Sequence, residues 1–269
     1  LKQSSNIFIG VFMKKIAVVA LAAAVMVSLF SCAKKETSSK FILGLDDSFP
    51  PLGFRNESDE IVGYDIDLAR EVTKRLGLEL VCQPITWSMN LQELNTKKID
   101  CIWNGFTMTE ERKAAMAFTK PYLANAQVVV VRADSGIVSL ADLAGKKVGV
   151  QAGSSAMDAI DAAPEFKNSL GEVVEFKENV TALNDLEIKS IDGVVMDMVV
   201  ANYSIKQTGK PFVVLSETLA VEEYGIAFRK TDTELRDKVQ KTLEEMKADG
   251  TVAKIDEKWF GTDLSVIGK

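Results

Sequence analysis

The sequence predicts an α/β fold in which mainly parallel sheets are flanked by helices on both faces. Short apolar runs of strand length alternate with longer segments whose apolar residues recur at helical spacing, and polar or glycine residues stand at the junctions. The chain has 269 residues, of which 47% are hydrophobic, so it can build one large domain or two lobes of ordinary size. Sheets of this kind bind ligands beyond the carboxyl ends of their strands.

The first half of the chain shows this alternation clearly. Strands are expected at its short apolar runs, which are residues 41–45, 61–62, 78–81 and 99–103. A helix is expected from Ile66, because apolar residues recur at helical spacing until Gly77 ends the segment, and Asp65 stands at its N-cap position. Ser88 is expected to cap a second helix and Thr109 a third, whose first turn carries acidic residues that the helix dipole favours.

The second half of the chain continues the pattern. Strands are expected at its apolar runs, which are residues 127–131, 147–150, 173–176, 193–196, 212–215 and 224–228. The first of these runs is interpreted as uninterrupted and apolar. Helices are expected between the strands, and a long one carries apolar residues at helical spacing from Leu235 to Met246. A last short helix is expected through Trp259 and Phe260.

Composition and charge exclude several classes of function. The chain contains no histidine, so Ser-His-Asp and Cys-His nucleophile systems, histidine proton shuttles and histidine-ligated metal sites are ruled out. Its formal charge is −6 and its basic residues are scattered singly or in pairs, which argues against a nucleic-acid partner. Without an imidazole, the groups of a binding site are expected to keep a fixed charge around neutral pH.

The N-terminus has the pattern of an export signal. Lys14 and Lys15 precede an apolar run over residues 16–30, about fifteen residues long, which suits a signal-peptide core better than a membrane-spanning helix of about twenty. Met13 stands where translation is expected to start, so residues 1–12 are interpreted as an upstream extension with no structural role. An uncleaved membrane anchor is the alternative.

The apolar run ends in Leu29-Phe30-Ser31-Cys32, which resembles a bacterial lipobox, although Phe30 is bulkier than the usual small residue. This resemblance implies that Cys32 is lipidated and becomes the first residue of the mature chain. The polar run after it lacks apolar periodicity and is expected to tether a soluble body to the membrane. Residues 1–31 are therefore assigned to the upstream extension and signal peptide, and residues 32–40 to the lipidated cysteine and tether.

Two cysteines remain in the mature chain, Cys82 and Cys101, and both lie in strand-like apolar runs. An exported compartment would permit a disulfide between them. If their strands flank a third one, however, the side chains are too far apart to bridge, so buried free thiols are expected. The chain has no Cys-x-x-Cys pair and no zinc-ligand spacing, and neither a metal nor a cofactor is expected.

Several short motifs follow one another between Phe41 and Gly261. They are Phe49-Pro50-Pro51, Gly63-Tyr64-Asp65-Ile66-Asp67-Leu68, Ile99-Asp100, Gly105-Phe106-Thr107-Met108-Thr109-Glu110-Glu111-Arg112, Pro121-Tyr122, Leu143-Ala144-Gly145-Lys146-Lys147-Val148-Gly149-Val150 and Tyr224-Gly225-Ile226-Ala227. In this order they resemble the polar amino-acid solute-binding proteins of ABC importers, which are family 3 solute-binding proteins with the type 2 periplasmic-binding-protein fold.

This resemblance implies two α/β lobes, each with a mainly parallel sheet, joined by two crossing strands. The crossings are expected near residues 127–131 and 218–224. Residues 41–126 and 221–269 would form lobe 1, and residues 127–220 would form lobe 2. The family pattern also implies that a ligand occupies the cleft between the lobes and that the lobes close on it.

A free amino acid presents a carboxylate, an ammonium and a side chain, and a dry cleft has to satisfy all three. Arg112 lies in the first turn of the helix that Thr109 caps, and its planar guanidinium matches a carboxylate bidentately. A surface pair with a neighbouring glutamate is the alternative. Ser154 and Ser155 stand at an expected helix N-terminus, where free N–H groups favour an anion, and are predicted to form a second carboxylate clamp; plain capping is compatible with this.

The predicted ammonium ligands come from both lobes. Asp197 stands at the carboxyl end of an expected second-lobe strand, which is a suitable place for a carboxylate that accepts an α-ammonium. A turn or cap residue is the alternative for an isolated aspartate. The resemblance adds two further ammonium ligands from the first lobe, the carbonyl of Gly105 and the hydroxyl of Thr107.

The ligand's side chain is expected to lie between two aromatic residues. Phe49 is followed by two prolines and Trp87 precedes an expected helix cap, so both are placed on loops that face the cleft. Asp46 follows the first strand, where members of the family contact the distal polar atoms of the ligand. Asn104 and Gln151 are further candidates for this end of the site.

These residues predict a lipid-anchored receptor that captures a free polar L-amino acid, closes around it and presents it to an ABC permease. Asp46 is acidic and Arg112 is assigned to the α-carboxylate, so a glutamine-like or basic ligand is favoured over an acidic one. The protein is expected to be a monomer in the periplasm or cell envelope, held by the lipid on Cys32, and no enzyme. A surface adhesin or sensor lipoprotein, and a cyclohexadienyl dehydratase on the same fold, are the alternatives.

Overall fold

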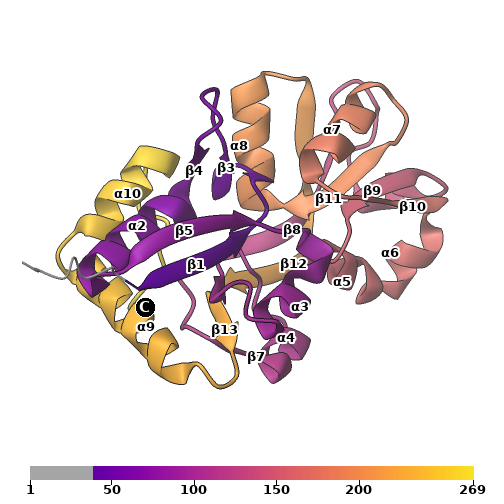
Figure 1. The fold of residues 1–269 in the computed structure, drawn as a ribbon. Coiled ribbons are helices and arrows are strands. Elements are labelled where there is room, and N and C mark those ends of the chain that lie inside the picture. The colour runs from indigo at the N-terminus through magenta and orange to yellow at the C-terminus, as the bar shows by residue number, and fades with distance from the viewer. Residues whose placement is uncertain (1–38) are drawn as a thin grey trace, which may run out of the picture. The chain divides into compact units, whose positions relative to one another are not determined.

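Two five-stranded sheets with flanking helices form the framework of residues 39–269, which are the residues that the computed structural model describes (Figure 1). The first sheet has the order β5 (Glu79–Pro84), β1 (Lys40–Leu45), β6 (Cys101–Ile102), β13 (Ala227–Arg229) and β7 (Met116–Phe118). The second has the order β10 (Glu172–Phe176), β9 (Lys147–Gln151), β11 (Gly193–Asp197), β8 (Leu123–Arg132) and β12 (Phe212–Tyr224). The predicted α/β class is confirmed, whereas the expected signal peptide and lipidated Cys32 lie outside the described residues.

Each sheet contains parallel and antiparallel pairs. In the first, β1 is parallel to β5 and β6, and β13 is antiparallel to β6 and β7. In the second, β9 is parallel to β10 and β11, and β8 is antiparallel to β11 and β12. The expected parallel pairing therefore holds for β5-β1-β6 and for β10-β9-β11. Strands β13 and β8 run the opposite way, because the chain, on changing sheets, enters each sheet from the side where its parallel strands end. Strands β7 and β12 are antiparallel to these two and run in the same direction as the parallel strands.

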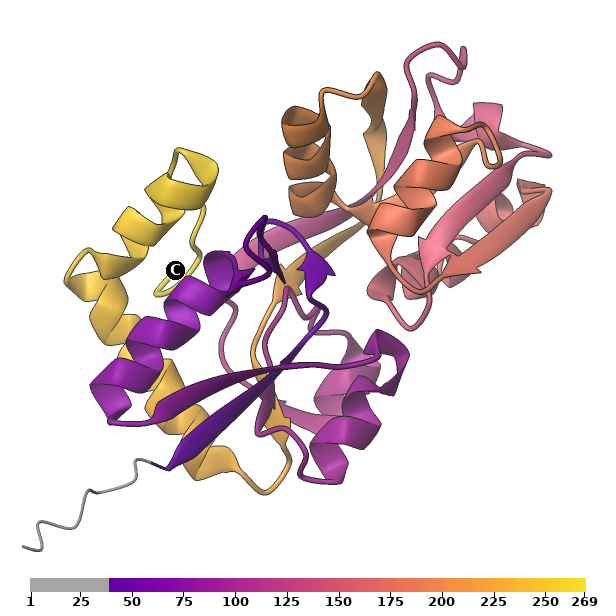
Figure 2. The same ribbon diagram turned by 45° about the horizontal axis from the view of Figure 1, so that its top comes forward.

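Two long strands, β8 and β12, join the sheets. The chain leaves the first sheet through β8 and returns through β12 to β13, and the two strands pair antiparallel with Asn125 opposite Glu222. Figure 2 shows them side by side between the two sheets. The crossings expected near residues 127–131 and 218–224 fall within these strands, which supports the prediction of two lobes joined by two crossing strands. The residue limits of the lobes stay a prediction.

Helices flank both sheets. In the lobe of the first sheet they are α2 (Tyr64–Leu76), α3 (Asn90–Asn95), α4 (Glu110–Ala115), α9 (Thr233–Ala248) and α10 (Thr251–Phe260). In the lobe of the second they are α5 (Ser155–Asp161), α6 (Pro164–Ser169), α7 (Asn179–Glu187) and α8 (Met198–Thr208). A small sheet of β2 (Ser48–Phe49), β3 (Gly53–Arg55) and β4 (Ile61–Val62) lies between β1 and α2 in the chain. Within residues 39–269, no helix combines the length and apolarity needed to cross a membrane.

Helix α2 begins before the position that the sequence indicates. Its N-cap is Gly63, and Asp65, expected to be the cap, lies in the first turn and is fully buried. Gly63 has a φ of 146°, and a Cβ at this position would overlap the backbone carbonyl of Leu52, so the close approach of the chain requires glycine. At the other end, Gly77 adopts the left-handed conformation that was expected of a helix stop.

The two caps expected after α2 have different outcomes. Ser88 is not an N-cap, because it lies inside a 3-10 turn, η1 (Trp87–Met89), that leads directly into α3. The carbonyl groups of this turn accept hydrogen bonds from the N–H groups at the start of α3, so no side-chain cap is needed. Thr109 does cap α4, since its hydroxyl accepts a hydrogen bond from the N–H of Arg112 at 3.2 Å.

The strand β8 is buried on both faces along most of its length. Val128 and Val130 pack in the largest apolar cluster, whereas Val129 and Val131 belong to a second cluster. Because successive side chains of a strand point to opposite faces, these clusters lie on opposite sides of the second sheet. The continuous valine run thus reflects burial on both sides. Gln127, however, is a polar residue with no exposed surface, so the interpretation of an uninterrupted apolar run was wrong there.

Strand β1 lies between the two strands that carry the cysteines. Leu43 on β1 is opposite Cys82 on β5 and opposite Cys101 on β6. Both thiols are free, as expected, but only Cys101 is fully buried, whereas Cys82 is half-buried. Burial raises the pKa of both thiols, so neither is a reactive thiolate at neutral pH.

Candidate functional site

The polar residues predicted to bind a ligand gather where the parallel strands of the two sheets end. Asp46 follows β1, Gln151 is the last residue of β9, and Thr107 lies in the loop after β6. Hydrogen bonds join residues of the two lobes here, between Gln151 Nε2 and Asp46 Oδ2 at 2.7 Å and between the hydroxyls of Ser155 and Thr107 at 3.0 Å. The candidate site therefore lies between the lobes, at the strand ends where such sheets bind ligands.

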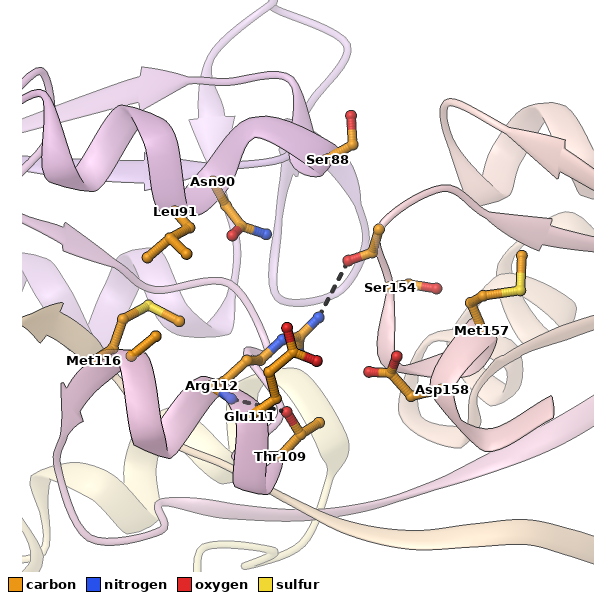
Figure 3. A pocket seen from close by; sticks show the side chains of 12 residues that line it. Ser88, Asn90, Leu91, Thr109, Glu111, Arg112, Met116, Ser154, Met157 and Asp158 are labelled. Atoms are coloured by element: carbon orange, nitrogen blue, oxygen red, sulfur yellow. Dashed lines mark hydrogen bonds between the residues drawn. The ribbon is translucent and has the colours of Figure 1, made fainter. Parts of the chain in front are cut away.

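Arg112 reaches from α4 to the second lobe (Figure 3). Its Nη1 donates to the carbonyl oxygen of Thr107 and its Nη2 donates to that of Gly153, each at 3.1 Å. The guanidinium carbon also lies 4.3 Å from the centre of the Phe106 ring, in cation–π contact. The side chain is thus held by neutral groups and leaves several N–H donors for a ligand, since a guanidinium has five.

Burial dominates the electrostatics of Arg112. The surface pair with a neighbouring glutamate does not form: no ion pair within residues 39–269 includes Arg112, and Glu110 pairs with Lys113 instead. Burial lowers the pKa of Arg112, and nearby carboxylates partly offset this effect. A guanidinium nevertheless stays charged near neutral pH. A ligand carboxylate would therefore meet a partly buried cation without an ionic partner.

A pocket of about 230 Å³ lies beside Arg112 (Figure 3). Its walls come from η1, α3 and α4 of the first lobe and from the start of α5 in the second. The lining residues are Ser88, Asn90, Leu91, Thr109, Glu111, Arg112, Ala115, Met116, Gly153, Ser154, Met157 and Asp158. The pocket gives solvent access to the guanidinium from the space between the two lobes.

Ser154 and Ser155 lie at the start of α5, as expected. Ser154 occupies the N-cap position, but its hydroxyl donates to the carbonyl oxygen of Gln151 at 2.7 Å and makes no side-chain cap. The Ser155 hydroxyl donates to Thr107 of the other lobe, and both serines are buried. The first N–H groups of α5 therefore have no side-chain acceptor, which suits an anion. The role of both serines as carboxylate ligands stays a prediction.

Asp197 is buried at the end of β11. Its Oδ1 accepts hydrogen bonds from Asn125 Nδ2 at 2.6 Å, from Gln127 Nε2 at 2.9 Å and from the Tyr224 hydroxyl at 2.7 Å. Burial raises the pKa of Asp197 to about 7, and the charge of Glu222 adds to this shift. The expectation that all site charges stay fixed around neutral pH is therefore wrong, because burial moves a carboxyl into the range where a histidine would titrate.

Four residues around Asp197 were missed from the sequence: Asn125, Gln127, Glu222 and Tyr224. All four lie on the crossing strands. Asn125 and Gln127 are two positions apart on β8, as are Glu222 and Tyr224 on β12, so the side chains of each pair point to the same face. The signal that could have revealed them is a polar residue at every second position where β8 is otherwise apolar.

A second polar group lies at the end of β1. Asp46 Oδ1 accepts hydrogen bonds from the N–H and the hydroxyl of Ser48, and the Asp46 N–H donates to Asn104 Oδ1 at 3.0 Å. Burial raises the pKa of Asp46. Asn179, which sequence reasoning missed, donates to Gln151 Oε1 at 3.5 Å. Asp46, Asn104 and Gln151, which were predicted to face the ligand's side chain, are thus brought together.

The two predicted aromatic residues border the loop after β6. Trp87 in η1 packs edge to face on Phe106, with ring centres 5.5 Å apart. Phe49 in β2 lies against Gly105, where an added Cβ would be 3.1 Å from the phenyl ring. Both aromatic side chains are buried, but they belong to different apolar clusters. The ligand sandwich between them stays a prediction.

Asp65 holds the Gly105 backbone in place. Its Oδ2 accepts hydrogen bonds from the Gly105 N–H at 2.8 Å and from the Tyr122 hydroxyl at 2.9 Å. Because the N–H of Gly105 is used in this way, its carbonyl is the group left for a ligand. Burial raises the pKa of Asp65 to about 7. Sequence reasoning missed this contact because Asp65 and Gly105 lie 40 positions apart.

Comparison with known proteins identifies the family. Residues 41–262 match the family model of the bacterial extracellular solute-binding proteins, family 3. This match covers most of the chain and includes both sheets. The chain is a family 3 solute-binding protein. The resemblance drawn from its motifs is confirmed, and the fold of the solute-binding protein agrees with the two-lobed architecture that this resemblance implies.

Relatives of this solute-binding protein are named for amino acids. It is 31% identical to the L-cystine-binding protein TcyJ of Escherichia coli over 86% of each chain. It is 34% identical to the arginine-binding extracellular protein ArtP of Bacillus subtilis, over 92% of this chain and 98% of that one. A solved ABC uptake transporter substrate binding protein from Streptococcus pneumoniae with bound histidine has a TM-score of 0.83 and 36% identity, over 84% of this chain and 94% of that one. All three are binding proteins and none is an enzyme, which argues against the dehydratase alternative.

Proposed function

We propose that this solute-binding protein captures a free polar L-amino acid outside the cytoplasmic membrane and delivers it to an ABC permease. One observation carries the proposal: a guanidinium, Arg112 on α4, and a carboxylate, Asp197 at the end of β11, come from different lobes and belong to one connected polar site. A free amino acid carries the complementary carboxylate and ammonium on one carbon atom. The relatives named for cystine, arginine and histidine support a ligand of this class.

The two charged ends of the ligand would be bound by different means. Arg112 keeps its contact with Thr107 and turns its remaining N–H donors to the ligand carboxylate, which the N-terminus of α5 approaches from the second lobe. The ammonium has three N–H donors and needs acceptors. Asp197, the Gly105 carbonyl and the Thr107 hydroxyl would supply them.

Ligand binding would hold the lobes closed. The first lobe supplies Arg112, Gly105 and Thr107, and the second supplies Asp197 and the start of α5, so only the closed arrangement satisfies both ends of the ligand. The crossing strands β8 and β12 are the connections that would bend. A ligand that makes contacts to the second lobe only after closure shifts the equilibrium to the closed state by the free energy of those contacts.

The side-chain end favours a glutamine-like or basic ligand. Asp46 accepts hydrogen bonds there, and Gln151 and Asn104 contribute amides. An acidic ligand side chain would be repelled by Asp46, whereas an amide, an ammonium or a guanidinium can donate to it. The Trp87 ring would tolerate a cation through cation–π contact.

We further infer that the protein is a monomeric lipoprotein of the periplasm or cell envelope. The motif that supports this inference is the lipobox-like Leu29-Phe30-Ser31-Cys32, which follows the charged and apolar segments of a signal peptide. Cys32 would carry the lipid, and residues 32–40 would tether the binding lobes. Family members are extracellular proteins, which supports export of this chain.

A thermal screen tests the proposed ligand class. The purified protein is heated alone and with each of the twenty L-amino acids in turn, and its unfolding temperature is followed by differential scanning fluorimetry. One or a few polar amino acids are expected to stabilise the protein by about 4 kcal/mol at a thousandfold excess over Kd, because they bind only the folded state. Aspartate and glutamate are expected to give no shift. The proposal is contradicted if none of the twenty raises the unfolding temperature.

A further inference from the structure

Glu222 lies on a crossing strand, yet its side chain reaches the centre of the candidate site. The end of β12 runs beside the loop after β6, with the Met108 N–H donating to the Glu223 carbonyl and the Gly225 N–H donating to the Phe106 carbonyl, both at 3.0 Å. Thr107 and Tyr224 form a β-bridge between the two segments. This backbone pairing sets the side chain of Glu222 next to that of Thr107.

A single oxygen of Glu222 lies within hydrogen-bond distance of groups from both lobes and from the neighbouring crossing strand. The groups near its Oε2 are Thr107 Oγ1 at 2.9 Å, Gln127 Nε2 at 2.8 Å, Asn125 Nδ2 at 3.1 Å and Ser155 Oγ at 3.3 Å. The Ser155 hydroxyl has the shorter contact to Thr107, at 3.0 Å, and a hydroxyl has only one proton to give. The Thr107 proton therefore goes to Glu222, and the Ser155 proton goes to Thr107.

These directions leave acceptors around Asp197. Thr107 gives its only proton to Glu222, so towards a ligand it can only accept. The amide nitrogens of Asn125 and Gln127 donate to Glu222 and Asp197, and their side-chain oxygens are buried without a partner among residues 39–269. A site with orphaned acceptors and two carboxylates is matched to a cationic N–H donor.

We propose that Glu222 is a positioning residue of the α-ammonium site, which orients Thr107, Asn125 and Gln127 so that this end of the cleft presents only acceptors. The proposal rests on the proposed function, because it concerns how the same site recognises the ammonium of an amino acid. Glu222 acts through its neighbours and also adds a negative charge beside Asp197, which strengthens the attraction for a cation.

The decisive substitution is Glu222→Gln, which keeps the shape of the side chain and removes its charge. Glu223→Gln is the matched control, because Glu223 is the next residue on β12 and its side chain is exposed. Binding of L-arginine, L-histidine, L-glutamine and L-cystine to the full chain is measured by isothermal titration calorimetry at about pH 8. For each amino acid that the wild type binds, Glu222→Gln is expected to raise Kd by about tenfold or more. Glu223→Gln is expected to change Kd by less than about twofold.

Two further measurements separate positioning from a structural role. In a Thr107→Val background, Glu222→Gln should cost clearly less affinity than in the wild type, because the hydroxyl that it orients is gone. Thr107→Ser keeps a hydroxyl and should restore the full effect. Equal losses in the two backgrounds, or an equal loss for Glu223→Gln, would overturn the proposal.

The pH dependence of unfolding of the ligand-free wild type and Glu222→Gln tests the role of Glu222 independently of the proposed function. Asp197 is faced by the charged groups of Glu222 from β12 and Arg112 from α4, and by the titratable hydroxyl of Tyr224 from β12. Removal of the Glu222 charge should lower the pKa of Asp197, so the difference in unfolding temperature between wild type and Glu222→Gln should change between about pH 5 and pH 8. If the unfolding temperatures of the two proteins instead change with pH in parallel, the placement of Glu222 beside Asp197 is overturned, independently of any binding result. Absence of any shift in the thermal screen of all twenty L-amino acids would contradict the proposed function, and the pH comparison would still decide on Glu222.

Discussion

Arg112 and Asp197 carry opposite charges in the same site, and burial affects them differently. Burial lowers the pKa of Arg112, but a guanidinium begins so far above neutrality that it stays charged. Burial raises the pKa of Asp197 to about 7, so its charge changes in the physiological range. The pH dependence of binding is therefore expected to come from the ammonium end of the site and not from the carboxylate end.

Arg112→Ala should abolish amino-acid binding without unfolding the protein. The substitution removes a partly buried bidentate donor, for which a loss of about 3 kcal/mol, or more than about a hundredfold in Kd, is expected. Arg112→Lys should give an intermediate loss, since it keeps the charge but not the planar fork. Calorimetric titration with the amino acid selected in the thermal screen measures the effect.

The matched control is Arg70→Ala, because Arg70 lies on α2 and is 53% exposed in a pair with Asp67. Its removal should leave both Kd and the unfolding temperature nearly unchanged. Full affinity in Arg112→Ala would show that the carboxylate site has been assigned to the wrong residue.

Helix α2 affects the site although none of its residues was predicted to touch a ligand. Its first turn carries Asp65, which binds the Gly105 N–H and the Tyr122 hydroxyl. Gly63 permits this arrangement because the chain passes too close to Leu52 for any side chain. The packing of the N-terminus of α2 is thus coupled to the backbone that would face the ligand's ammonium.

Substitution of glycine at the two ends of α2 should have unequal effects. Gly63→Ala must move the backbone away from Leu52, and a loss of at least about 2 kcal/mol in the free energy of unfolding is expected. In Gly77→Ala, the added Cβ has no atom within 4 Å, so the expected loss is only that of an alanine in the left-handed conformation, about 1 kcal/mol. Urea unfolding of both variants measures the difference. Equal losses would contradict the steric explanation for Gly63.

Across the whole molecule, burial disfavours the ionised form of several carboxyl groups in the folded state. Asp65, Asp197 and Asp256 have pKa values raised to about 7, 7 and 6, in each case mainly by burial. A carboxyl whose pKa is higher in the folded than in the unfolded chain binds more protons when folded. Its effect on stability is therefore most favourable at low pH and is lost as the pH rises through the folded value.

Stability and affinity should consequently change in opposite directions with pH. The ligand-free protein is expected to gain unfolding free energy as the pH falls from about 8 to about 5, by at most about 1.4 kcal/mol per pH unit for each of these carboxyls. Over the same interval, affinity for the selected amino acid should fall, because the ammonium requires an ionised Asp197. Scanning fluorimetry and calorimetric titration at several pH values measure both quantities.

Asp197→Asn provides the control for this pH dependence. The variant should bind weakly at every pH, and its unfolding temperature should vary less with pH than that of the wild type, since one of the titrating groups is gone. A wild-type affinity that stays constant, or that rises as the pH falls, would contradict the assignment of Asp197 to the ammonium.

The α/β class, the order of most elements and the family could be predicted from the sequence, because these depend on local periodicity, on caps such as Thr109 and on contiguous motifs. The sequence also indicated that Asp46, Asn104, Arg112, Gln151 and the two serines belong near one site, since residues at the carboxyl ends of parallel strands meet at one edge of a sheet.

The surroundings of Asp197 and its charge follow from the packing of the folded chain and could not be predicted from the sequence. Glu222 and Asn125 lie 97 positions apart and meet because β12 pairs with β8. The contact of Asp65 with Gly105 and the buried position of Gln127 depend in the same way on how distant segments pack. A pKa depends on burial and on neighbouring charges, and both are set by contacts between residues far apart in the chain, which no local pattern records.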